Sequence, residues 1–272
     1  MTGLRIVAIG DVVGRPGRRA VRELLPELRA RFAPCFVIAN AENAAGGSGI
    51  TLDTARELLE AGCDCLTSGD HFFEKPEVNE LIEKEPRVLR PANWSRHAPG
   101  RGWGVFEAPE GRRVAVLNLM GRTFMRFTPD SFFDAADELV ERLRAETPLV
   151  AVDFHAEATS EKLALGRYLD GRVTFIFGTH THVQTADERV LPGGTAYISD
   201  IGMVGPHDSI LGRDHEAILS RLRTQVPSRF DVAKGDVRLS GAVAFADTET
   251  GRALSVERLQ VALPGEPAGG PR

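Results

Sequence analysis

The chain has 272 residues, of which 42% are hydrophobic and 26% charged, with 28 glycines and 16 prolines spread along its length. This length and composition favour one large globular domain and exclude collagen-like, low-complexity and wholly disordered proteins. The net charge of -5 argues against a protein whose main task is to coat nucleic-acid phosphates. No apolar run reaches the roughly 18 to 20 residues that a membrane span needs, and no secretory leader precedes the first apolar run. We therefore expect a cytoplasmic protein with no membrane anchor.

The three cysteines, Cys35, Cys63 and Cys65, are too few and wrongly spaced for a disulfide framework or a four-thiolate zinc site. Each lies in or beside an apolar, strand-like run. We expect them to be reduced core residues.

Short β-branched runs alternate along the chain with longer amphipathic runs, a pattern that predicts β-α-β units. The predicted strands are 4–10, 35–39, 64–68, 104–107, 113–119, 149–154, 173–177, 195–198, 241–246 and 254–261. The predicted helices are 15–32, which Pro26 would kink or split, 52–61, 130–145, 160–169 with Ser160 as N-cap, and 214–223.

Repeated β-α-β units imply parallel strands with helices on the faces of the sheet. The final strands, from 195–198 onward, look antiparallel and could form a second sheet packed on the first. We find neither an internal repeat nor an interdomain linker, so residues 1–263 are predicted to form a single domain. The Gly- and Pro-rich residues 264–272 are predicted to be a disordered tail.

Polar, metal-capable side chains follow five of the predicted strands. Ligands of open α/β sheets bind at the carboxyl ends of the strands, so these five loops are expected to converge on one rim. The loops contain Gly10-Asp11, Asn40-Ala41-Glu42-Asn43, Gly69-Asp70-His71, Asp153-Phe154-His155 and Gly178-Thr179-His180-Thr181-His182.

Taken singly, most of these residues have simpler explanations. A lone aspartate such as Asp11 is usually a turn residue or a helix cap, and a lone histidine such as His155 is usually an ordinary core or surface residue. His180 and His182 are a stronger signal, because residues two apart in an extended segment point the same way and could hold one metal ion or two adjacent ions. The five loops together are what makes a metal centre the leading hypothesis.

The number and the hard oxygen and nitrogen character of these groups suit two ions of the iron, manganese or zinc type, because one tetrahedral zinc would use only three or four of them. Two ions roughly 3.5 to 4 Å apart can both bind phosphate oxygens and activate a bridging hydroxide. Phosphoester hydrolysis is the reaction that this arrangement suggests.

Six blocks of the sequence resemble the YmdB-type branch of the bacterial calcineurin-like metallophosphoesterases. They are GDVVGRPGRR, NAENAAGGSGIT, SGDHFFEK, NLMGR, DFHAEATSEK and GTHTHVQTADERVLPGGTAYISDIGMVGPHDSILG, and they run in order from about Leu4 to beyond Gly212. The resemblance implies an α/β fold of four layers, an α/β/β/α sandwich of two mixed sheets flanked by helices. It also implies a di-iron centre and phosphodiesterase activity on 2',3'-cyclic nucleotides.

The resemblance also implies a role for each site residue. One ion would be held by Asp11, Glu42 and His182. Glu42 would bridge to the other ion, which would also be held by Asn43, Asp70, His155 and His180. His71 would be the general acid that protonates the leaving alkoxide, with a loop histidine that orients a backbone carbonyl as the lesser alternative.

One position departs from the family pattern, which has Gly-Asn-His where this chain has Gly69-Asp70-His71. With two divalent ions and one hydroxide, the carboxylates of Asp11, Glu42 and Asp70 bring the cluster to zero formal charge, whereas an asparagine would leave one positive charge. We expect Asp70 to bind metal more firmly but to attract anionic phosphate less, or to favour a ferric ion.

Other signals are weaker. Arg15, Arg18, Arg19 and Arg22 form one helical stripe that could steer RNA or phosphate, although a solvated face is the simpler interpretation. Gly46-Gly47-Ser48-Gly49 fits neither the Walker nor the dinucleotide pattern and is interpreted as a flexible rim loop. The segment with His207 and Asp208 either lines the substrate pocket or is a turn.

The sequence thus predicts a dinuclear metal-dependent phosphodiesterase with two metal ions per subunit, iron or alternatively manganese or zinc. Its predicted substrate is a small 2',3'-cyclic nucleotide, with RNA as another candidate partner and a homo-oligomer left open. The alternatives are a phosphomonoesterase or nuclease with the same centre, and a regulatory RNA- or nucleotide-binding protein with weak or no turnover.

Overall fold

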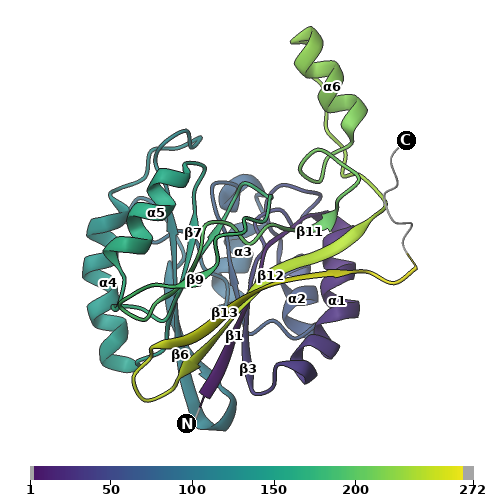
Figure 1. The fold of residues 1–272 in the computed structure, drawn as a ribbon. Helices are drawn as coiled ribbons and strands as arrows, with labels where there is room; N and C mark the ends of the chain where they lie inside the picture. Colours follow the sequence, from purple (N-terminus) through teal and green to yellow (C-terminus); the bar gives the residue numbers. More distant parts are fainter. Residues whose placement is uncertain (1–2, 266–272) are drawn as a thin grey trace.

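The computed structural model describes residues 3–265, which form two β-sheets with helices on their outer faces (Figure 1). The tail predicted at 264–272 lies outside the described residues from position 266 onward. None of the helices within the described range is long and apolar enough to cross a bilayer.

The first sheet has the strand order β2-β11-β12-β1-β3-β4, with β13 added on β12. Its strands are β1 (Gly3–Ile9), β2 (Asp11–Val12), β3 (Cys35–Asn40), β4 (Cys65–Thr67), β11 (Met203–Pro206), β12 (Val237–Asp247) and β13 (Ala253–Ala262). Strands β1, β3 and β4 are parallel. Strand β12 is antiparallel to β1 along the whole length of β1, from Gly3 opposite Asp247 to Ile9 opposite Gly241.

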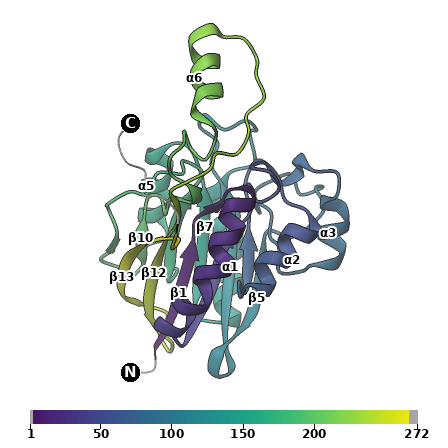
Figure 2. The same cartoon turned by 90° about the vertical axis from the view of Figure 1, so that its right-hand side faces the viewer.

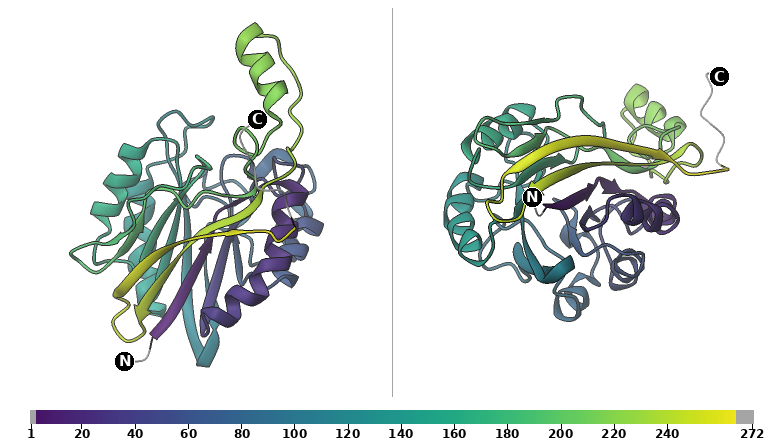
Figure 3. Two further views of the ribbon diagram at one scale, coloured as in Figure 1. Left: turned by 45° about the vertical axis from the view of Figure 1, so that its right-hand side comes forward. Right: turned by 60° about the horizontal axis from the view of Figure 1, so that its bottom comes forward.

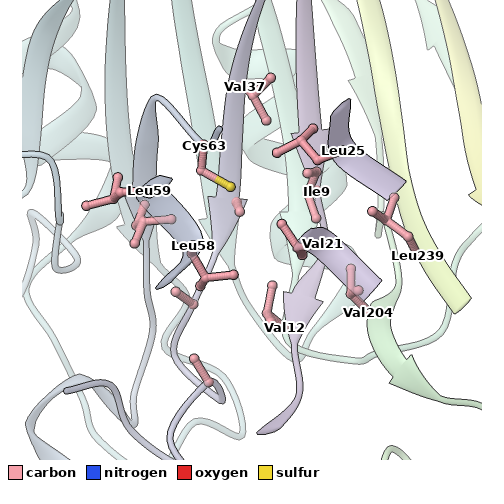
Figure 4. Packing of buried hydrophobic residues seen from close by; sticks show 14 of the residues in the cluster. Ile9, Val12, Val21, Leu25, Val37, Leu58, Leu59, Cys63, Val204 and Leu239 are labelled. Carbon is pink, nitrogen blue, oxygen red and sulfur yellow. The ribbon is translucent and has the colours of Figure 1, made fainter. Parts of the chain in front are cut away.

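Helices α1 (Gly14–Arg31), α2 (Leu52–Glu60) and α3 (Val78–Lys84) belong to the side of the first sheet that faces away from the second (Figure 2). The buried stripe of α1 includes Val21 and Leu25, which pack with Ile9 and Val37 of the sheet (Figure 4). Thr51 caps the start of α2, because its hydroxyl accepts a hydrogen bond from the Thr54 backbone N–H.

The second sheet has the strand order β5-β6-β7-β8-β10-β9. Its strands are β5 (Trp103–Ala108), β6 (Arg112–Met120), β7 (Val150–His155), β8 (Phe175–Thr179), β9 (Arg189–Val190) and β10 (Ala196–Ile198). Helices α4 (Phe132–Glu146) and α5 (Thr159–Tyr168) cover its outer face. Two single-turn 3-10 helices lie at Phe72–Glu74 and Pro109–Gly111. Helix α6 (His215–Thr224) projects away from the two sheets, and none of its residues is buried (Figure 1).

The side chains of β1 alternate between two cores, as the period of a strand requires. Leu4, Ile6 and Ala8 face the second sheet, whereas Val7 and Ile9 face the helices of the first. The two sheets therefore pack on each other between two helical layers, as both views in Figure 3 show. The predicted α/β/β/α sandwich is confirmed.

Three details of the predicted fold are wrong. The last two strands do not form a second sheet, because β12 pairs with β1 and β13 pairs with β12. Helix α1 runs unbroken through Pro26, whose exposed position lets water satisfy the carbonyl left without a donor. Ser160 is not a cap, because α5 starts one residue earlier, after Ala158, with no side-chain cap. The short elements α3, β2, β9 and β11 were not predicted.

Candidate metal centre

The predicted site residues lie at the carboxyl ends of strands from both sheets. Asp11 follows β1, Glu42 and Asn43 follow β3, and Asp70 follows β4. His155 is the last residue of β7, and His180 and His182 follow β8. Since the sheets pack face to face, these ends meet, and the structure brings all seven predicted ligands and His71 into one chain of contacts.

Four of these residues form a compact group that could hold a metal ion. One ligand atom each from Glu42, Asp70, His155 and His180 lies within 4.8 Å of all the others. Nε2 of His155 is 3.2 Å from a Glu42 carboxylate oxygen, 3.4 Å from Oδ1 of Asp70 and 3.0 Å from Nδ1 of His180. All but His180 are buried.

The tautomer of His155 follows from the groups beneath it. The Thr179 hydroxyl donates its single hydrogen to Oδ1 of Asp153 at 2.7 Å, so it can only accept from Nδ1 of His155, which lies 2.9 Å away. A neutral His155 therefore carries its hydrogen on Nδ1. Its Nε2 lone pair points at the carboxylates of Glu42 and Asp70.

A second group of acceptors lies next to the first and is formed by Asp11, Asn43 and His182. The Leu211 carbonyl, which can only accept, is 3.1 Å from Nδ1 of His182, so the bare Nε2 of a neutral ring faces Oδ1 of Asn43 at 3.2 Å and Oδ1 of Asp11 at 3.9 Å. The Asn43 amide is oriented by its Nδ2, which donates to the Gly47 carbonyl at 3.2 Å.

The chemistry of the two groups suits a bound cation. Oδ1 of Asp11 and Oδ1 of Asp70 are buried and have no hydrogen-bond partner. A buried carboxylate oxygen without a hydrogen-bond donor destabilises the folded protein, and the groups around each of these two oxygens are themselves acceptors. Carboxylate, amide and neutral imidazole are the ligands that iron, manganese and zinc accept. The residues present therefore fit a metal centre.

Burial and the crowding of charge shift the pKa values in this site. Burial lowers the pKa of His180 to about 4, with the charge of His155 acting in the same direction, and burial also lowers the pKa of His182. Both rings are thus neutral and able to ligate metal. Burial also lowers the pKa of His155, but the charges of Glu42 and its neighbours outweigh this and hold that pKa well above its usual value. The same negative potential that attracts a proton to His155 attracts a metal cation.

His71 lies at the edge of the cluster, with its side chain 30% exposed. Nδ1 of His71 is 3.2 Å from Oε1 of Glu42, and the hydrogen bond to Glu42 raises the pKa of His71. The backbone N–H of His71 donates to Oε2 of Glu42 at 3.3 Å, so that carboxylate also fixes the loop. This arrangement keeps a proton on a ring that is open to solvent.

The interpretation of His180 and His182 as a same-side pair assumed that the GTHTH segment is extended. The structure shows that it is not. Strand β8 ends at Thr179, and the backbone then turns through two positive φ values, 95° at His180 and 64° at His182. Left-handed non-glycine residues are strained and concentrate at functional sites. The turn sends His180 to the Glu42 group and His182 to the Asp11 group.

Several supporting residues were missed from the sequence. Asp153, Thr179, Asn40 and Thr67 form a buried hydrogen-bonded layer beneath His155. Asn40, Asp153 and Thr179 stand in the strand-end motifs named from the sequence, but no role was predicted for any of the four. All four lie inside strands and resemble ordinary buried polar residues.

The weaker motifs lie around the centre rather than in it. The glycine-rich loop is tied down rather than free, since the Arg213 guanidinium donates to the carbonyls of Gly46 and Gly47. In the arginine stripe, Arg18 and Arg22 contact Glu57, and Arg19 contacts Glu23. Nδ1 of His207 bonds the Gly205 carbonyl within its own turn.

The chain is similar to known proteins over nearly its whole length. A family model described as YmdB-like protein matches residues 7–259. The 2',3'-cyclic-nucleotide 2'-phosphodiesterase of Bacillus subtilis is 49% identical over 258 residues, covering 95% of this chain and 97% of that protein. A putative phosphatase/phosphodiesterase of Mycoplasma pneumoniae is 35% identical over 268 residues, covering 96% of this chain and 94% of that protein.

Two solved structures resemble this chain over nearly its whole length. A hypothetical protein from Thermus thermophilus has a TM-score of 0.89 at 41% identity, covering 96% of this chain and 100% of that one. A novel phosphatase from Mycoplasma pneumoniae has a TM-score of 0.90 at 33% identity, covering 99% of this chain and 96% of that one. The chain belongs to the YmdB-like protein family.

Proposed function

We propose that this protein is a metal-dependent phosphodiesterase with two metal ions, and that its substrates are 2',3'-cyclic nucleotides. Family membership and the similarity to a solved phosphatase make it a phosphoester hydrolase. The name of the Bacillus subtilis relative supports the narrower substrate class. The observation that carries the proposal is the pair of adjacent acceptor groups, each with a buried carboxylate oxygen that has no donor.

We assign the ligands from the two groups. Glu42, Asp70, His155 and His180 would hold one ion. Asp11, Asn43 and His182 would hold the other, with Glu42 between the two. This moves Asn43 from the ion that the family resemblance implied to its neighbour, because the amide oxygen of Asn43 lies beside His182. We propose iron, with manganese or zinc as alternatives.

Two bound ions would act as Lewis acids on the phosphoryl oxygens and generate the nucleophile from water. The chain's own residues then have two tasks. Asp153 and Thr179 keep the His155 ring in the tautomer that can ligate. His71, protonated on Nδ1 towards Glu42, offers its other ring edge to the substrate and gives a proton to the departing ribose oxygen.

Parallel assays test the reaction class. With the metal-loaded protein, we expect hydrolysis of 2',3'-cyclic nucleotides and of a bis-aryl phosphate, and much less of a mono-aryl phosphate. Dominant turnover of the mono-aryl ester would identify a phosphomonoesterase instead. If no supplied metal supports turnover of any ester while nucleotide still binds, the protein is a binding module.

His71→Ala tests the general acid. General acid catalysis contributes about 10²- to 10⁴-fold, so we expect a fall in kcat of that order with nucleotide binding and metal content retained. The loss should shrink for an aryl ester, whose leaving group needs no proton. Elemental analysis of protein purified without added metal should find two ions per chain, and a count of zero or one would contradict the dinuclear centre.

The three cysteines are buried and form no disulfide. Since free thiols are typical of reducing compartments, we propose a cytoplasmic protein.

A further inference from the structure

The loop that follows β6 is part of neither metal-ion group, but it begins at the metal centre. Strands β6 and β7 are parallel, with Met120 opposite His155. The next residue, Gly121, donates its backbone N–H to the His155 carbonyl at 2.9 Å. The loop therefore leaves the sheet beside a proposed metal ligand.

This loop is held on both sides. On the His155 side, the backbone N–H and hydroxyl of Thr123 donate to the Glu161 carboxylate, the hydroxyl at 3.0 Å. On the other side, Arg126 pairs with Glu74 at 2.9 Å, three residues after His71. Only two residues, 124 and 125, lie between these attachments.

An aromatic stack reinforces the second attachment. The Phe127 ring lies 5.2 Å from the Trp94 ring, which lies 5.3 Å from the ring of Phe73. Phe73 and its neighbour Phe72 follow His71 directly in the chain. The loop thus spans from the segment of His155 to the segment of His71, the two histidines on either side of Glu42.

Phe124 lies between the two attachments, with an exposed side chain and a strained backbone. Its side chain is 86% exposed, more than any other large apolar side chain of residues 3–265, and its φ is 63°. A bulky residue in the left-handed region is strained, and an exposed ring gains little from folding to offset that strain. An ordered loop that displays a strained, exposed aromatic ring needs a reason other than stability.

We propose that Phe124 stacks on the base of the nucleotide substrate and so determines the preference for nucleotides over other phosphodiesters. The loop starts at the metal centre, and three residues span at most about 11 Å, so Phe124 is within reach of a base whose phosphate lies on the centre. Aromatic side chains stack on bases that are not held in a duplex. This inference rests on the proposed function, since it assumes a cyclic nucleotide as substrate.

The test compares two substrates that differ only in the base. They are adenosine 2',3'-cyclic phosphate and the 2',3'-cyclic phosphate of methyl riboside. Base stacking contributes about 1 to 3 kcal/mol, or about 5- to 150-fold, so Phe124→Ala should lower kcat/KM for the nucleotide by that factor. The value for the riboside and the inhibition constant of inorganic phosphate should not change, and Phe124→Trp should keep the nucleotide preference.

Leu222→Ala is the matched control, because Leu222 is an apolar side chain 71% exposed on α6 and lies in neither metal-ion group. The inference is overturned if Phe124→Ala leaves the nucleotide preference unchanged, or if it lowers kcat/KM equally for both substrates. It is also overturned if the variant changes only the sedimentation of the protein, since Phe124 would then contact another copy of the chain. Failure of the wild type to hydrolyse either cyclic phosphate would instead reject the proposed function.

Discussion

The ammonium group of Lys162 lies 2.7 Å from a carboxylate oxygen of Asp200, and both side chains are almost fully buried. The same carboxylate accepts hydrogen bonds from the backbone N–H and hydroxyl of Thr181, which stands between His180 and His182. Lys162 also donates to the Thr179 carbonyl at 2.9 Å. This ion pair therefore holds the turn that presents two of the proposed metal ligands.

Lys162→Met should destabilise the protein and loosen this turn. Removing one partner of a buried ion pair costs about 3 to 5 kcal/mol, because the other charge is left buried and uncompensated. Urea unfolding of the metal-free protein measures the loss, and metal titration should show weaker binding. Lys84→Met is the control, since Lys84 pairs with Glu80 on the surface, and we expect little change from it.

The double variant Lys162→Met with Asp200→Leu separates stability from function. It removes both charges, so much of the lost stability should return. Metal binding should stay weak, because Thr181 loses its acceptor. Recovery of both properties would contradict the positioning role of Asp200.

Thr179→Val should weaken metal binding, because the hydrogen of the neutral His155 ring would no longer be held on Nδ1. The substitution removes the hydroxyl that joins Asp153 to His155 with little change in shape. Loss of such a supporting partner typically lowers metal affinity about 10- to 100-fold. Thr179→Ser keeps the hydroxyl and should retain wild-type affinity. Equal affinities for the two variants, measured by competition with a chelator, would show that the hydroxyl has no such role.

Asp70→Asn should weaken metal binding and strengthen the binding of phosphate. The variant adds one positive charge to the loaded centre and replaces a carboxylate whose Oδ1 has no other partner. We expect faster loss of metal to a chelator and a lower inhibition constant for inorganic phosphate. If metal retention, phosphate inhibition and turnover all match the wild type, the hypothesis about this position is wrong.

The three cysteine thiols should be unreactive in the native protein. Burial raises the pKa of Cys63 to about 12, and burial also raises the pKa values of Cys35 and Cys65. A raised pKa keeps a thiol protonated, and only the thiolate is a strong nucleophile. At pH 8, a thiol reagent should react with none of the three in the folded state and with all three in guanidinium chloride. Fast labelling of the folded protein would contradict this.

Much of the fold could be predicted because its cause is local. The alternation of Leu4, Ile6 and Ala8 with Val7 and Ile9 marks a strand buried on both faces, and the period of the apolar residues in α1 marks a helix with one buried side. The loops that carry the candidate site could be found for the same reason. Each begins where an apolar strand ends, and parallel strands end at the same edge of a sheet.

The rest depended on contacts between distant segments. Strand β12 pairs with β1 across more than two hundred residues of sequence, and no local pattern states which strand will be its neighbour. The same is true of Lys162 and Asp200, of the Leu211 carbonyl at His182, and of the side of the centre on which Asn43 lies. Periodicity and strand-end chemistry are properties of neighbouring residues, so the sequence by itself determined which side chains could form the site. The tertiary structure decided which strands pair, which nitrogen of each histidine carries the hydrogen, and where the backbone is left-handed. These features arise only when the two sheets pack together.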